Sequence, residues 1–72
     1  MANEFLNQFV KVNFRTLDKE HTPVVRTVRG KVLNETDEFL FVDDVGYGKI
    51  AIARREIVAV IFITEQAAKE MP

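Results

Sequence analysis

The sequence has no cysteine and no serine, and only three glycines and two prolines occur among its 72 residues. The lack of cysteine excludes a disulfide framework and a thiolate metal site. The lack of both residue types also removes the two commonest catalytic nucleophiles. No glycine pattern of a P-loop or of a dinucleotide-binding fold is present. We therefore expect a protein that is not an enzyme and that carries no cofactor.

Metal-ligand patterns are equally scarce. His21 is the single histidine, and it lies in a polar segment with no cysteine or second histidine to join it. Two acidic segments, 35–38 and 43–44, lack the spacing of a calcium-binding EF-hand loop. We expect these carboxylates to be solvated turns and predict no metal site.

The chain also lacks a long apolar run and a strong net charge. No run reaches the roughly 18 residues of a membrane-spanning helix, and Met1–Glu4 lacks the basic charge of a signal peptide. We expect an intracellular, cytoplasmic protein that does not bind a membrane. The net charge of −1 and the pI of about 5.7 argue against coating nucleic acid through bulk charge.

Charge is nevertheless distributed unevenly along the chain. Residues 11–31 contain six cations and two carboxylates, whereas residues 35–44 contain five carboxylates and no cation. If the fold separates these segments, one face is basic and another acidic. The other interpretation is an ordinary surface of mixed ion pairs.

The longest apolar stretch spans residues 50–63, and its second half, 57–63, has no polar residue on either face of a strand. Such a strand must be covered on both sides. A domain of this size buries only about 60% of its unfolded surface, so another chain is the natural cover. We predict that this stretch is both core and subunit interface, and that the interface contains Ile50, Ile52, Ile57, Val58, Val60, Ile61 and Phe62.

The pattern along the chain predicts one all-β domain over residues 1–72. Asn3 can cap a short helix at about 3–9, and alternation of apolar and polar residues predicts strands at about 9–17, 24–34, 38–43, 49–54 and 57–63. Gly30 falls on the inward face of the second strand, which indicates a bend, a bulge or a close backbone approach. Residues 64–70 favour a final helical turn or a frayed tail. Short connections predict a strongly bent antiparallel sheet that closes into an SH3-like barrel.

Four segments carry a resemblance to a known family: Phe5–Asn7, Arg29–Val32, Asp37–Val42 and Ala53–Val60. Together they resemble the Sm/LSm superfamily, which includes the bacterial Hfq proteins, over residues 5–63. The resemblance implies a homo-oligomeric ring of about five to seven subunits. In such a ring the fourth strand of one subunit pairs with the fifth strand of the next, and single-stranded RNA binds near the pore.

The resemblance also implies which residues bind RNA. Asp37 would brace the turn before the third strand, Glu38 lies in that turn, and Phe39 would stack on a base. Arg54 and Arg55, at the corner between the fourth and fifth strands, would bind phosphate or base edges. This chain departs from the family pattern at Glu38 and Phe39, where an asparagine or glutamine is usual after the aspartate. It also has Ala53 and Arg55 where relatives carry an aromatic residue and a glycine.

The residues themselves leave alternatives open. A core position is favoured for Phe39, because we expect one ring of Phe39-Leu40-Phe41 to point inward. Arg54 and Arg55 form either an anion site or a solvated turn paired with Glu56. For Tyr47, which lies between two glycines, a ring folded over the barrel is favoured over a ring presented to a ligand.

Two functions are therefore compatible with the sequence. The first is an Sm-like ring that binds single-stranded RNA. The second is a self-assembling structural or adaptor barrel that binds no nucleic acid, which the acidic stretch 35–44 favours.

Overall fold

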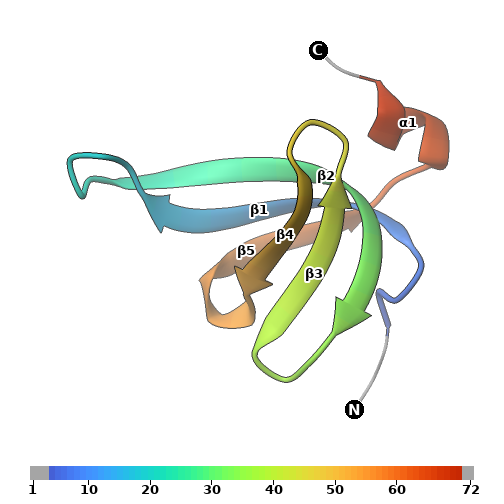
Figure 1. Cartoon of the computed structure of the whole chain (residues 1–72), viewed down its shortest axis with the longest axis horizontal. Coiled ribbons are helices and arrows are strands. Elements are labelled where there is room, and N and C mark those ends of the chain that lie inside the picture. Colours follow the sequence, from blue (N-terminus) through green and yellow to red (C-terminus); the bar gives the residue numbers. More distant parts are fainter. Residues whose placement is uncertain (1–3, 71–72) are drawn as a thin grey trace.

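The computed structural model describes residues 4–70 and shows five antiparallel strands in one sheet, with one short helix (Figure 1). The strands are β1 (Phe9–Leu17), β2 (Pro23–Glu35), β3 (Phe39–Asp44), β4 (Gly48–Ala53) and β5 (Ile57–Phe62). A 3-10 turn, η1 (Arg54–Glu56), joins β4 to β5. The order across the sheet is β4-β3-β2-β1-β5, so β4 and β5 form its two edges. The predicted five-stranded antiparallel fold is confirmed at this level.

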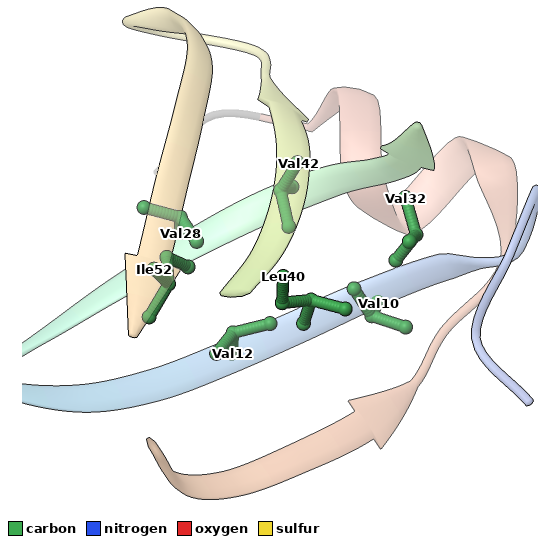
Figure 2. Packing of buried hydrophobic residues seen from close by; sticks show 7 residues of the cluster. All are labelled: Val10, Val12, Val28, Val32, Leu40, Val42 and Ile52. Atoms are coloured by element: carbon green, nitrogen blue, oxygen red, sulfur yellow. The ribbon is translucent and has the colours of Figure 1, made fainter. Parts of the chain in front are cut away.

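The core lies on the face of the sheet toward which alternate residues of β1, β2, β3 and β4 point. Val10 and Val12 of β1 face it from positions opposite Gly30 and Val28 of β2. The complete buried cluster is Val10, Val12, Val28, Val32, Leu40, Val42 and Ile52 (Figure 2). Full burial of each such side chain contributes about 1.5–3 kcal/mol, and the cluster draws on four of the five strands.

Strand β2 pairs with β1 along its first part and with β3 along its last part. β2 passes very close to β3 at Gly30, where an added Cβ would lie 1.9 Å from the carbonyl oxygen of Asp43. A register shift between Val32 and Asn34 follows within the same ladder. The close backbone approach expected at this glycine is confirmed.

The predicted helix at 3–9 is wrong. Residues 4–7 form a turn, and Asn3 lies outside the described residues. Asn7 has a φ of 63°, in the left-handed region, which is incompatible with continuing an α-helix. Its N–H donates to the carbonyl of Val32 at 2.9 Å. An isolated helix this short is unstable. Hydrogen bonds to β2 instead satisfy the backbone polar groups of this segment.

The helix lies at the other end of the described chain. Helix α1 (Glu65–Lys69) follows β5, and the hydroxyl oxygen of Thr64 caps it by accepting from the N–H of Ala67 at 3.0 Å. Ala68 is fully buried, and α1 packs on β1 and β2. Of the two expectations for this segment, the helical turn is confirmed. No helix within residues 4–70 is long and apolar enough to cross a membrane.

Candidate nucleic-acid interface

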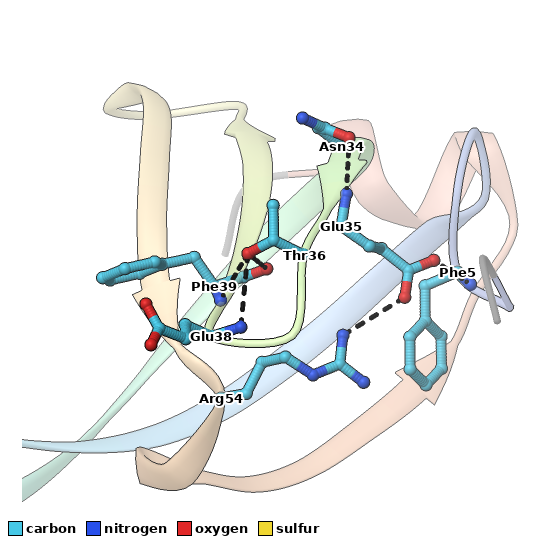
Figure 3. Close-up of polar contacts among 7 residues, drawn as sticks. All are labelled: Phe5, Asn34, Glu35, Thr36, Glu38, Phe39 and Arg54. Atoms are coloured by element: carbon cyan, nitrogen blue, oxygen red, sulfur yellow. Dashed lines mark hydrogen bonds and ion pairs between the residues drawn. The ribbon is translucent and has the colours of Figure 1, made fainter. Parts of the chain in front are cut away.

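The turn before β3 and the corner after β4 lie side by side (Figure 3). They meet because β3 and β4 are paired neighbours, with Phe39 opposite Ala53. The N–H of Arg54 also donates to the carbonyl of Glu38 at 2.9 Å. The structure therefore brings together Glu38, Phe39 and Arg54, three of the residues predicted to bind RNA.

The turn before β3 is held by Thr36. Its hydroxyl oxygen accepts from the N–H of Phe39 at 2.9 Å and from the N–H of Glu38 at 3.3 Å. The N–H of Thr36 donates to the carbonyl of Phe39 at 2.9 Å. Asp37 is exposed. The brace predicted at Asp37 is thus supplied by Thr36, one residue earlier.

The core position favoured for Phe39 is wrong, because the side chain is 40% exposed. Leu40 points into the core, so strand alternation turns both Phe39 and Phe41 outward. Their ring centroids lie 6.1 Å apart, and the β4 residues opposite them are the small Ala53 and Ala51. This face of β3 presents an aromatic pair beside short neighbours, which is a surface on which a base can stack.

Arg54 is bound to a carboxylate that the sequence did not single out. The side chain of Glu35 is only 2% exposed, and its Oε1 accepts from the Arg54 guanidinium at 3.2 Å. Its other oxygen, Oε2, accepts from the N–H of Phe5 at 2.7 Å. A buried carboxylate needs such partners. Arg54 therefore fixes the β4–β5 corner to the end of β2 and to the N-terminal turn (Figure 3).

Arg55 lies next to Arg54 but in a different environment. Its side chain is 88% exposed, and its contact with a carboxylate is a 3.8 Å ion pair with Glu56. Glu56 makes a second 3.8 Å pair with Arg15, whose guanidinium also donates to the carbonyl of Arg55 at 3.5 Å. Exposed pairs of this kind contribute about 0–1 kcal/mol. Arg55 is therefore paired with Glu56, as one alternative expected, and remains accessible to an anion.

The acidic stretch 35–44 is less acidic at the surface than its sequence indicates. Besides Glu35, Asp44 is buried, and its carboxylate accepts from the N–H groups of Arg29, Gly46 and Tyr47. The carboxylates that remain exposed are Asp37, Glu38 and Asp43. Over residues 4–70, no cluster of three or more histidine or acidic side chains is arranged to hold a metal ion. His21 is exposed at the β1–β2 turn.

The predicted interface residues divide between core and surface. Ile52 is buried at 2% exposure, and Ile50, Ile57 and Val60 pack partly against the same core. The side chain of Ile52 therefore faces the core of its own chain, as expected for a stretch that is core as well as interface. The side chains exposed along β5 are Val58, Ile61 and Phe62, with exposures of 57%, 45% and 58%.

Comparisons with protein-family models, with curated proteins and with solved structures find no significant match for this chain.

Proposed function

We propose that the protein is an Sm-like small barrel that assembles into a ring and binds single-stranded RNA. In this ring, β4 of one subunit pairs with β5 of the next, and the bent sheet closes around its core. The strand order supports the proposal, since it leaves β4 and β5 as the two edges of the sheet. An edge strand with exposed apolar side chains is a template for another chain. A closed ring of about five to seven copies leaves no edge unpaired.

Two exposed side chains, one beside the β2–β3 turn and one in the neighbouring β4–β5 corner, support RNA as the ligand. Phe39 offers a ring on which a base can stack, and Arg55 offers a cation for the phosphate. Arg54 acts through Glu35 to hold the corner in place and is a positioning residue. Repetition of Arg55 around a ring would concentrate positive potential near the pore, which offsets the exposed carboxylates of Asp37 and Glu38.

Titration of fluorescently labelled short oligo(U) and oligo(A) RNA, read as anisotropy at low salt, tests this function. We expect Phe39→Ala to weaken binding by about 5- to 150-fold, which corresponds to the loss of one stacked base. Arg55→Ala should weaken binding and flatten its dependence on salt. Lys19→Ala is the matched control, because it removes an exposed cation from the β1–β2 turn.

The same titration separates RNA binding from the adaptor function. Wild-type protein that assembles but binds neither RNA at low salt favours the adaptor. Binding that is unchanged in both Phe39→Ala and Arg55→Ala contradicts the placement of the RNA at the β2–β3 turn.

A further inference from the structure

Tyr47 is the most exposed large apolar side chain in the described chain, at 79%. The expectation that its ring folds over the sheet is therefore wrong. Its backbone is nevertheless held firmly. Oδ2 of the buried Asp44 accepts from the N–H groups of Gly46 and Tyr47, both at 2.8 Å, and Oδ1 accepts from the N–H of Arg29 on β2 at 3.0 Å. The turn thus presents a free aromatic ring on a fixed backbone, so that little loop ordering is needed when a ligand binds.

A hollow of about 420 Å³ lies beside Tyr47, and we call it the Tyr47 hollow. Phe14, Val28 and Ile50 give it apolar walls, and Arg26 of β2 adds an exposed cation. The hydroxyl of Thr27, which also lines the hollow, is already engaged, because it donates to Oδ1 of Asn13 at 2.8 Å. None of its lining residues, all within the described chain, is acidic. An exposed aromatic ring, apolar walls and an arginine suit a ligand that joins a flat, unsaturated ring to an anionic group.

A second hollow, of about 450 Å³, also has Tyr47 in its lining but is less suited to an anion. The acidic residue Glu70 contributes to its lining. The guanidinium of Arg29, which also lines this hollow, already donates a hydrogen bond to the carbonyl of Glu70 at 3.2 Å. Asp44 also lines this hollow, although both of its oxygens accept backbone N–H groups. The charge distribution therefore favours the Tyr47 hollow.

We propose that the Tyr47 hollow binds one nucleotide of single-stranded RNA, with the base stacked on the Tyr47 ring and the phosphate held by Arg26. The inference depends on the proposed function for its class of ligand, but it places a second contact on a different surface. Phe39 begins β3, whereas Tyr47 follows the end of the same strand. At about 3.3 Å per residue, the length of β3 separates the two surfaces by roughly 16 Å.

The composition of the chain provides a direct probe. Tyr47 is the single tyrosine, and there is no tryptophan, so the intrinsic fluorescence of the protein reports on Tyr47 alone. We expect oligo(U) or oligo(A) to quench this fluorescence at low salt, after correction for RNA absorbance with free tyrosinamide. Tyr47→Ala should weaken RNA binding in the anisotropy assay by about 5- to 150-fold, whereas Tyr47→Phe, which keeps a ring, should retain most of the affinity.

Arg26→Ala should move the quenching curve to higher RNA concentration, and Lys19→Ala should leave it unchanged. RNA binding by anisotropy without quenching of Tyr47 overturns the Tyr47 hollow and leaves the proposed function intact. Quenching that persists in Phe39→Ala and Arg55→Ala at unchanged affinity supports the Tyr47 hollow and contradicts the site at the β2–β3 turn. A wild-type protein that shows neither binding nor quenching overturns both.

Discussion

Replacement of Gly30 by alanine tests the close backbone approach of β2 to β3. The new Cβ would lie 1.9 Å from the carbonyl oxygen of Asp43 and 2.7 Å from its carbonyl carbon, whereas Cβ atoms essentially never approach within 3.0 Å of another atom. Both obstructing atoms belong to the backbone, so no side-chain rotation relieves the contact. β2 and β3 would have to separate by more than an ångström at this point, which weakens their hydrogen bonds and opens the core beneath Val42.

We expect the Gly30→Ala substitution to lower the free energy of unfolding by about 3 kcal/mol, at the upper end of the range for overpacking. For a domain of this size, such a loss lowers the melting temperature by about 12–24 °C. Circular dichroism during thermal and urea unfolding measures both quantities. Gly48→Ala is the matched control, because Gly48 has a φ of +86° but no atom within 4 Å of an added Cβ. It should lose only about 1 kcal/mol through backbone strain. A Gly30→Ala protein as stable as Gly48→Ala would refute the close approach of the two strands.

Three further perturbations test the polar contacts. Glu35→Ala should lower the free energy of unfolding, measured by urea denaturation, by about 3 kcal/mol, because it removes the acceptor for the Arg54 guanidinium and for a backbone N–H. Glu35→Gln should lower the free energy of unfolding by less, and equal losses in the two variants would contradict the role of these contacts. Asp44→Ala should cost about 2 kcal/mol and shift the backbone amide resonances of the β3–β4 turn, since three N–H groups lose their acceptor. The hydrogen bond and charge of Lys69 lower the pKa of Glu65 below its ordinary 4.5, so this pair should stabilise α1 above pH 4.5 and lose that effect as the pH falls through the lowered pKa. Carboxyl resonances in an NMR titration report the pKa of Glu65, and Lys69→Ala should raise this pKa toward its ordinary value.

The strands could be predicted because their signal is local. In β1, Val10 and Val12 alternate with polar residues, and the structure buries both valines. Gly30 could be assigned to the inward face of β2 because it falls in register with Val28 and Val32. In both cases the period of two in a strand determines which side chains are buried, without knowledge of the partner strand.

Features that depend on distant partners could not be predicted. Asn7 has a left-handed backbone conformation, and its N–H donates to the carbonyl of Val32, which lies 25 positions further along the chain. Residues 35–44 contain five carboxylates, and residue type alone does not distinguish the buried Glu35 from the exposed ones. The burial of Glu35 depends on its ion pair with Arg54, which lies in the distant β4–β5 corner. The first four residues of β3, 39–42, are all apolar, so none of them marks the outer face of the strand, and for this reason the orientation of Phe39 was predicted wrongly.

The mass of the native assembly, measured by native mass spectrometry and light scattering at micromolar concentration, tests most directly whether β4 and β5 of separate subunits pair. We expect the wild-type protein at about five to seven times the 8.3 kDa mass of the chain. The double variant Val58→Lys with Ile61→Lys replaces two exposed apolar side chains of β5 with cations. It should be a monomer whose circular dichroism spectrum keeps the β-sheet signal of the wild type. A wild-type protein that is monomeric under these conditions, or a double variant that keeps the full assembly mass, would contradict the proposed ring.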